Sequence, residues 1–264
     1  DANQLSSIGP GDVLNNLLSC DNIKKKVLNE IYRVKEGSYI TYLANDIKNT
    51  KCFDKFDNYD DFKFIEASDE EIIPYLVEIC KSACRKGIKP DNFQVLAPMY
   101  KGFNGIDNLN RVMTDIFNPN KNKVMINDNY YSVGDKVIQL VNDVENNVFN
   151  GDIGYIKEIE YAGKKLVVTI DYMGNYVEYT SGEFDKFMLA YAISIHKSQG
   201  SEYDNVVVIL AKGFSRMFYN KLIYTAVTRA KSSLIIIGSV ESLNKSVSTL
   251  YATNRKTYLK YINN

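Results

Sequence analysis

The stretch AYAISIHKSQGSEYDNVVVIL, from Ala190 to Leu210, decides the fold of this chain. A polar run from Ser194 to Glu202 holds the only histidine, His196, and opens into the β-branched run Val206 to Leu210. A run so short and so apolar is typical of a strand buried on both faces, as strands of parallel sheets are. The sequence therefore predicts an α/β protein whose parallel sheet contains this strand.

A second stretch, YTAVTRAKSSLIIIG from Tyr224 to Gly238, has the same design. Tyr224 to Lys231 has a helical pattern, and Leu234 to Gly238 predicts a second buried strand. Two polar segments that each lead into a central strand should meet at one end of the sheet, and α/β proteins bind ligands at a sheet end. We therefore expect Arg229 to be delivered to a ligand site, where its guanidinium suits a phosphate.

Length and composition narrow the class of protein. The 264 residues are 45% hydrophobic and 24% charged, which suffices to bury the core of one large domain or two smaller ones. The 32 basic and 32 acidic residues balance, whereas a protein that coats nucleic acid through its overall field carries a basic excess. Any contact with nucleic acid must therefore come from a local groove.

The cysteines and the hydropathy of the sequence bear on three questions: metal binding, membrane contact and cellular location. The four cysteines are scattered, and with one distant histidine and no CxxC pair we expect idle thiols, no metal site and a reducing cytoplasmic location. No apolar run approaches the 18 residues of a membrane span, and no signal peptide is visible, so no membrane partner is expected.

The middle of the chain changes character near Lys121. Before it, a helical pattern at Asp69 to Gly87, a strand at Phe93 to Met99 and a helix at Gly105 to Phe117 give a β-α-β rhythm. From Tyr130 to Thr180, short strands alternate with Asn-Gly, Ala-Gly and Gly-Asn turns, which predicts hairpins closed into a small barrel.

Aromatic residues of this predicted barrel have two interpretations. Tyr131, Phe149 and Tyr155 would stack bases or hold a peptide if they are exposed. Alternatively, they pack in the core of so small a fold.

Several short motifs carry a resemblance to a known family. HKSQGSE followed by VVV, and YTAVTRAK followed by a strand, resemble the fifth and sixth motifs of superfamily-1 DNA helicases, most closely the RecD-like branch, the exodeoxyribonuclease V alpha-subunit type. Further similarity, in the family's order, is carried by DANQLSSIGPG at residues 1–11, EIYR at 30–33, FQVLAPMYKGFNGIDNLN at 93–110 and VFNGDIGYI at 148–156.

The resemblance implies a RecA-like parallel-sheet motor domain with an inserted small SH3-like β-barrel. Residues 1–20 would be the tail end of a first motor domain, residues 21–122 and 183–264 the second motor domain, and residues 123–182 the barrel. The sequence has no GxxxxGK[ST] phosphate loop and no acidic pair for magnesium. We expect both to lie upstream, so the chain would be a C-terminal half that is inactive alone.

The same resemblance implies roles at an ATP site. Arg33 and Arg229 would converge on the γ-phosphate with Glu202 nearby, since a guanidinium offers two parallel hydrogen bonds. Tyr32 would stack on the adenine, and Gln4 would sense the terminal phosphate, because an amide both donates and accepts. The alternatives are a surface arginine beside a core tyrosine, an arginine that caps its own helix, and a glutamine in an ordinary turn.

Other motif residues match ribose and DNA contacts of the family. Glu202 would accept from the ribose, and Gly200 permits a close backbone approach. Ser194 and His196 would hydrogen-bond a phosphate of the DNA strand. A solvated glutamate and a structural histidine are the alternatives. Two residues depart from the family's pattern: Ser6 replaces the usual proline, which would loosen that loop, and Val34 stands where RecD-like proteins often have a glutamine, which weakens the expected base contact relative to that of Arg33.

The function implied is that of an ATP-dependent DNA helicase that uses ATP and Mg²⁺ and moves 5′ to 3′ on single-stranded DNA at a duplex junction. Its partners would be the missing N-terminal motor domain and subunits of a recombination complex. The alternatives are a DNA- or protein-binding module on a helicase-like scaffold, and a relaxase-helicase fusion.

Overall fold

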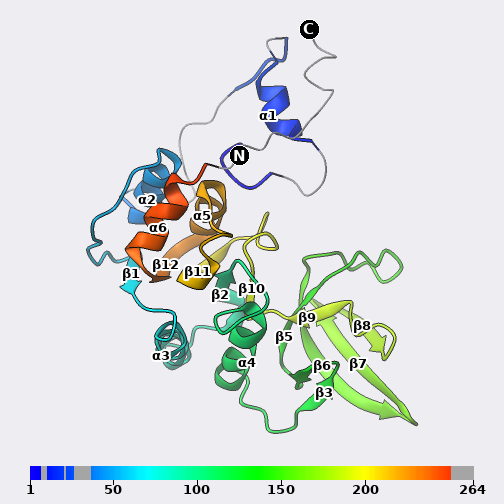
Figure 1. Ribbon diagram of the computed structural model, residues 1–264. Helices are drawn as coiled ribbons and strands as arrows, with labels where there is room; N and C mark the ends of the chain where they lie inside the picture. The colour runs from blue at the N-terminus through cyan, green and yellow to red at the C-terminus, as the bar shows by residue number, and fades with distance from the viewer. Residues whose placement is uncertain (7–10, 21, 27–36, 251–264) are drawn as a thin grey trace.

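A computed structural model describes residues 1–6, 11–20, 22–26 and 37–250, and these form two main sheets (Figure 1). The first sheet has five strands in the order β1-β12-β11-β2-β10, all parallel. Its strands are β1 (Phe62–Glu66), β2 (Phe93–Ala97), β10 (Ala192–Ser194), β11 (Tyr203–Leu210) and β12 (Ala230–Gly238). The predicted parallel sheet, with the strand that ends at Leu210 at its centre, is confirmed.

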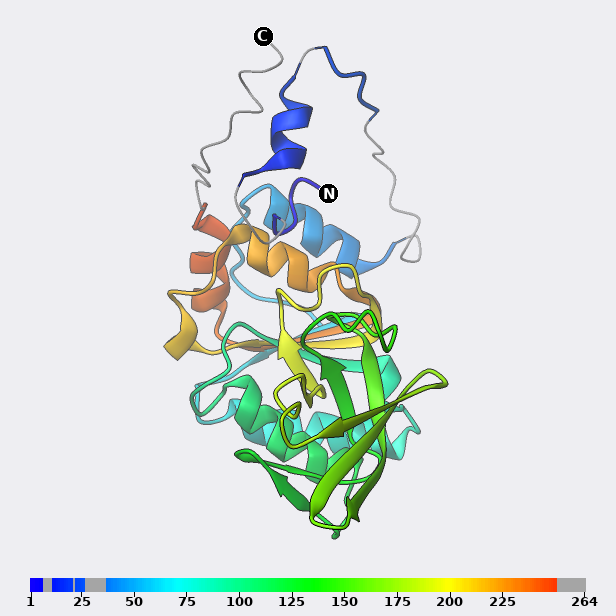
Figure 2. The ribbon, with the colours of Figure 1, turned by 90° about the vertical axis from the view of Figure 1, so that its right-hand side faces the viewer.

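Helices cover both faces of the first sheet, as Figures 1 and 2 show. The helices are α1 (Val13–Leu18), α2 (Tyr39–Lys48), α3 (Ile72–Arg85), α4 (Ile106–Phe117), α5 (Asn220–Val227) and α6 (Val240–Ser248), with short 3₁₀ turns η1 (Pro90–Asn92) and η2 (Lys212–Phe214). Val206 and Val208 of β11 pack with α2, α5 and α6, whereas Val207 and Ile209 pack with α3 and α4. This alternation arises because successive strand side chains point to opposite faces.

The second sheet is antiparallel and forms the predicted barrel, with the order β8-β7-β6-β5-β9 and a separate β3-β4 ribbon. Its strands are β3 (Val124–Ile126), β4 (Asn129–Tyr131), β5 (Lys136–Gln139), β6 (Ile153–Ala162), β7 (Lys165–Tyr172), β8 (Asn175–Thr180) and β9 (Phe187–Leu189). Strand β9 pairs with β5, with Leu189 opposite Val137. The sheet therefore extends past residue 182, and the chain returns directly from β9 to β10 of the first sheet.

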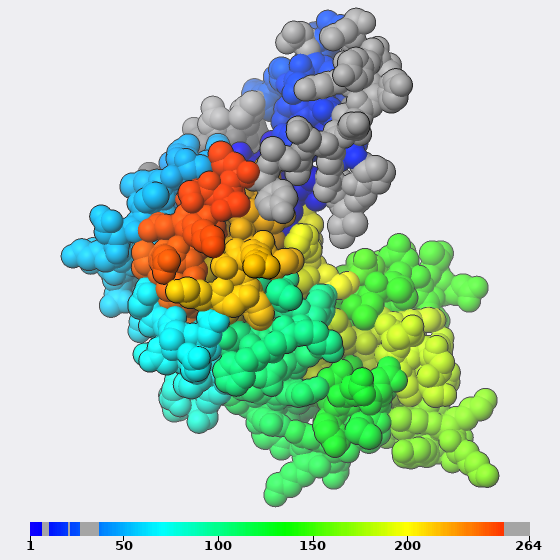
Figure 3. Space-filling view, viewed as in Figure 1, coloured from blue at the N-terminus to red at the C-terminus, as the bar shows by residue number. Residues whose placement is uncertain are grey.

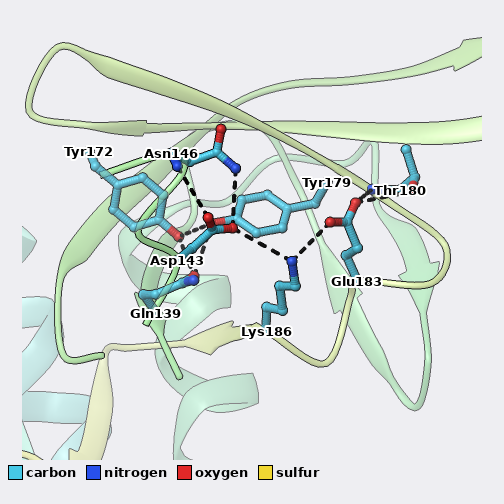
Figure 4. Close-up of polar contacts among 8 residues, drawn as sticks. All are labelled: Gln139, Asp143, Asn146, Tyr172, Tyr179, Thr180, Glu183 and Lys186. Atoms are coloured by element: carbon cyan, nitrogen blue, oxygen red, sulfur yellow. Dashed lines mark hydrogen bonds and ion pairs between the residues drawn. The ribbon is translucent and has the colours of Figure 1, made fainter. Parts of the chain in front are cut away.

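A cluster of polar side chains links several segments of this barrel (Figure 4). The Gln139 side-chain oxygen accepts hydrogen bonds from the hydroxyls of Tyr172 at 3.0 Å and Tyr179 at 2.9 Å. Nearby, the Lys186 ammonium lies 3.6 Å from an Asp143 carboxylate oxygen. These contacts join β5, β7, β8 and the segment before β9, so we assign the cluster to the barrel's own stability.

The barrel lies directly against the part of the molecule that contains the first sheet (Figure 3), and the two share their apolar cores. One buried cluster contains both Val207 of β11 and Ile170 of β7, and a second contains both Leu222 of α5 and Ile138 of β5. Tyr191, between β9 and β10, stacks on Phe117 of α4 with ring centroids 5.9 Å apart. The two sheets are therefore packed as one body along β5 and β9.

Gly238 ends β12 at a position that only glycine fits. Its φ is +154°, and an added Cβ would lie 2.3 Å from the backbone oxygen of Leu210 on β11. We expect Gly238→Ala to lower the free energy of unfolding by about 2 kcal/mol or more, because neither backbone can move without breaking the sheet. Urea unfolding measures this. Gly182→Ala, at a glycine with open space around it and no positive φ, is the matched control and should change stability by less than about 0.5 kcal/mol.

Candidate nucleotide and nucleic-acid site

The turn between α5 and β12 carries Arg229. The sequence pattern predicted a helix to Lys231 and a strand from Leu234, and both bounds are wrong, since α5 ends at Val227 and β12 begins at Ala230. Lys231, Ser232 and Ser233 are polar, so they lie outside the apolar run that predicted the strand. Pairing with β11 nevertheless holds them extended. Arg229 therefore lies just before the amino end of a strand.

Arg229 is almost fully buried, with 3% of its surface exposed. Its Nε donates to the Thr225 carbonyl at 3.1 Å, which matches the helix-capping alternative. One terminal nitrogen donates to the Ser201 carbonyl at 2.9 Å, and the Arg229 carbonyl accepts from the Tyr203 backbone at 2.9 Å. The two polar segments thus meet, as predicted, but at the edge where the parallel strands begin, here called the amino edge, rather than at the usual ligand-binding carboxyl ends.

Glu202 lies at the same edge. Its two chain neighbours both bond to Arg229, and its carboxylate lies 3.7 Å from the Lys231 ammonium. Gly200 is exposed, with φ of +82°, a conformation that side chains other than glycine rarely adopt. The amino edge therefore brings together an arginine, a carboxylate and an accessible glycine turn.

The first residues of the chain also lie against this edge. The Leu5 backbone donates to the Thr225 hydroxyl at 2.9 Å, and the Gln199 amide donates to the Leu5 carbonyl at 2.8 Å. Gln4 is half-buried beside this contact. Sequence reasoning did not single out Gln199 or Thr225, although both stand inside the quoted motifs.

Tyr32 and Arg33 lie outside the described residues. Their convergence with Arg229 on one phosphate therefore stays a prediction. In the described part, Gly200 and Glu202 flank Ser201, which bonds to Arg229, and Gln4 precedes Leu5, which bonds to Thr225 and Gln199.

Ser194 and His196 lie at the opposite, carboxyl end of the sheet, where β10 ends. The Ser194 hydroxyl accepts from the Lys197 backbone at 3.2 Å, which fixes the turn that follows. His196 is exposed, but neighbouring atoms remove enough water to lower its pKa below the ordinary value. The Lys197 ammonium donates to the Asn150 side chain at 3.0 Å, joining this turn to the barrel loop between β5 and β6.

The three barrel aromatics named above differ in how exposed they are. Tyr131 is buried in the core at 4% exposure, and the Tyr155 hydroxyl donates to Asp91 at 2.5 Å. Tyr131 therefore follows the core-packing interpretation, whereas Tyr155 is half-buried with its hydroxyl directed to η1. Phe149 alone of the three is exposed, at 44%.

Three further features of the described residues bear on metals, membranes and thiol chemistry. Residues 1–6, 11–20, 22–26 and 37–250 contain no group of three or more metal-binding side chains. No helix in the same part of the chain has the length and apolar character of a membrane span. The four cysteines carry thiols rather than disulfides, and burial raises the pKa of Cys80 to about 12, so its thiol is a poor nucleophile.

The chain thus folds as an α/β domain with a parallel sheet, and a small β-barrel stands in the chain between β2 and β10. Residues 109–170 match the family model of the ATP-dependent RecD-like DNA helicase SH3 domain, and residues 189–237 match the UvrD-like helicase C-terminal domain. The resemblance to RecD-like superfamily-1 helicases is confirmed.

Curated relatives agree with these matches. The chain is 39% identical over 153 residues to the ATP-dependent RecD2 DNA helicase of Deinococcus radiodurans, covering 58% of this chain and 21% of that protein. It is 26% identical over 248 residues to the RecBCD enzyme subunit RecD of Buchnera aphidicola, covering 84% of this chain and 40% of that subunit. The chain thus spans between a fifth and two fifths of these relatives.

Solved structures give a weaker similarity. The Pif1 helicase from Candida albicans is 17% identical, with a TM-score of 0.47, covering 84% of this chain and 57% of that one. The Bacteroides Pif1 helicase in complex with ADP-AlF3 and single-stranded DNA is also 17% identical, with a TM-score of 0.41, covering 85% of this chain and 54% of that one. Similarity at this level has no bearing on function.

Proposed function

We propose that this chain is the second motor half of an ATP-dependent DNA helicase that moves along single-stranded DNA. Residues 1–20 belong to the end of the first motor domain, 21–122 and 183–264 to the second, and 123–182 to the barrel, whose sheet is completed by β9 of the second motor domain. The observation that carries the proposal is the contact of Leu5 with Thr225 and Gln199, because it joins the third-motif stretch to the fifth and sixth beside Arg229.

The residues of the amino edge fit part of an ATP site. The Arg229 guanidinium is held in place by carbonyls, and a held cation stabilises charge on a transferring phosphate without reorganising. Glu202 supplies an acceptor for a sugar hydroxyl, and Gln4 a group that both donates and accepts. The phosphate loop and the magnesium ligands come from the first motor domain, and Arg33 and Tyr32 complete the nucleotide contacts.

In this proposal ATP, with Mg²⁺, binds between the two motor domains, and its hydrolysis opens and closes them. The chain's own part is to hold Arg229 against the nucleotide and to present Ser194 and His196 to the DNA strand. Travel is 5′ to 3′, as the branch implies, and the subunits of a recombination complex are the candidate protein partners.

The chain alone should not hydrolyse ATP. This is expected because the 264 residues contain neither phosphate loop nor magnesium carboxylates, and one arginine cannot position a nucleotide. ATPase assays with and without single-stranded DNA, run beside the intact enzyme, measure it. Robust DNA-stimulated hydrolysis by the chain alone contradicts the proposal. DNA binding by an intact protein that never hydrolyses ATP favours the binding-module alternative.

His196 should contact DNA as a neutral ring at pH 7 to 8. Because its pKa is lowered, it gains a proton only in more acidic solution, so affinity for single-stranded DNA should rise as the pH falls below about 6.5. His196→Ala should weaken binding about fivefold, the worth of one hydrogen bond, and abolish the rise. Fluorescence anisotropy with an oligothymidine measures both effects.

His196→Gln is the matched control, since its amide can still donate but cannot titrate in this range. It should keep most of the affinity at pH 7.5 and lose the acidic rise. If His196→Ala binds as tightly as the original chain at every pH, the DNA-contact assignment is wrong.

A further inference from the structure

Lys136 is a buried lysine at the junction of the two sheets. It begins β5 of the barrel, and only 1% of its surface is exposed. Its ammonium donates to the Pro90 carbonyl at 2.7 Å and to the Gln94 side-chain oxygen at 3.0 Å, and the Phe93 carbonyl lies at 3.4 Å. A barrel side chain therefore ends among the backbone carbonyls at the start of β2.

The same ammonium reaches the start of β11. It lies 5.8 Å from the centroid of the Tyr203 ring, within the range of a cation–π contact. Tyr203 follows Glu202 directly, its backbone donates to the Arg229 carbonyl at 2.9 Å, and the Arg229 charge acts on its hydroxyl. Tyr203 thus meets the buried lysine of the barrel through its ring and the buried arginine of the amino edge through its backbone.

Stability alone does not explain a lysine here. Burial lowers the pKa of Lys136 to about 8, so the folded chain binds fewer protons than the unfolded chain between pH 8 and the ordinary 10.5. By linkage, the penalty for burying the cation is fully present below about pH 8 and is relieved as the pH rises towards 10.5. A methionine of similar length would avoid that penalty, since buried charges often cost stability.

We infer that Lys136 is a positioning residue, which fixes Tyr203 and through it Arg229 to the barrel. The barrel is thereby coupled to the amino edge through a polar side chain, in addition to the shared apolar cores. The consequence for ATP hydrolysis rests on the proposed role of Arg229, whereas the coupling itself does not.

The titration of Lys136 must be distinguished from that of other ionisable groups near this contact. Asp91 of η1 faces the ammonium and raises its pKa, while burial raises the pKa of Tyr155, Tyr191 and Tyr203, which therefore stay neutral near pH 8. Burial raises the pKa of Asp135 above its ordinary value. Two further charged groups, Lys197, whose pKa is also lowered by burial, and Glu202, lie on the segment before β11.

The test follows the Nε and Cζ chemical shifts of Arg229 by NMR from pH 6.5 to 9.5 in the chain itself. The Arg229 resonance is assigned by its loss in Arg229→Lys. We expect a titration step with a midpoint near pH 8, absent in Lys136→Met. It should persist in Lys197→Met, and in Lys186→Met, a barrel lysine whose ion pairs stay within the barrel.

Two results overturn the inference: no step between pH 7 and 9 in the original chain, or a step that survives Lys136→Met. If Lys136→Met does not fold, Lys136→Arg serves instead, because its permanent charge removes the step while keeping a donor. A step that survives Lys136→Arg also overturns it.

In the intact enzyme, Lys136→Met should lower kcat by 10- to 100-fold, on the order expected for a misplaced catalytic group, without weakening DNA binding. If Arg229→Lys leaves ATP hydrolysis unchanged, the proposed function fails, while the coupling of Lys136 to Arg229, which the NMR titration tests, is unaffected. If Arg229→Lys abolishes hydrolysis but Arg229 shows no step, the inference alone fails.

Discussion

Replacing Arg229 with lysine in the intact enzyme is expected to reduce ATP hydrolysis on the order of 10³-fold or more. Lysine keeps a positive charge but loses the planar fork that holds two acceptors while facing a phosphate. Here that fork already bonds to the carbonyls of Thr225 and Ser201, so a point charge cannot both hold the turn and reach a nucleotide. Steady-state ATPase kinetics with saturating single-stranded DNA measure the loss.

Binding of single-stranded DNA without nucleotide should survive Arg229→Lys, because Ser194 and His196 lie at the other end of the sheet. The matched control is Arg216→Lys, an exposed arginine before α5, which should leave hydrolysis unchanged. Circular dichroism melting checks that the buried substitution leaves the fold intact. A folded Arg229→Lys enzyme that hydrolyses ATP at the original rate excludes the arginine from the reaction.

Deleting residues 123–181 and bridging the gap with Gly-Ser should strongly destabilise the motor domain. A barrel that is a plain insertion, as the resemblance implies, would leave a folded domain behind after such a deletion. The structure argues against that, because Ile138 packs in the α5 core cluster and β9 would lose its partner β5. Each large apolar side chain uncovered costs about 1.5–3 kcal/mol, so several together approach the whole stability of a domain.

Thermal melting by circular dichroism measures this, and we expect a midpoint lowered by at least about 10 °C or the loss of a cooperative transition. Shortening the β6–β7 hairpin by replacing residues 161–166 with Gly-Gly is the control. Tyr161 at that tip is 68% exposed, so the shortened chain should melt close to the original temperature. A deletion of 123–181 that melts as sharply and as high as the original chain would show that the barrel is an independent insertion.

The sequence was sufficient for the features that depend on local pattern. The β-branched run Val206 to Leu210 predicted a strand buried on both faces, and the glycine turns predicted the antiparallel hairpins. The spacing of the motifs predicted that the segments before β11 and β12 meet, and the Arg229 bonds to Ser201 and Tyr203 confirm it. Each of these follows from side-chain periodicity or turn chemistry along a short stretch.

Only the tertiary structure decided which polar and aromatic residues are buried. Lys136 and Tyr155 follow no local pattern that distinguishes them from surface residues, yet one is buried among the carbonyls at the start of β2 and the other bonds to Asp91. Likewise, Ala230 joins β12 because β11 supplies its hydrogen bonds. The physical reason is that burial and strand pairing depend on partners distant in sequence, so a residue's own neighbours along the chain do not determine them.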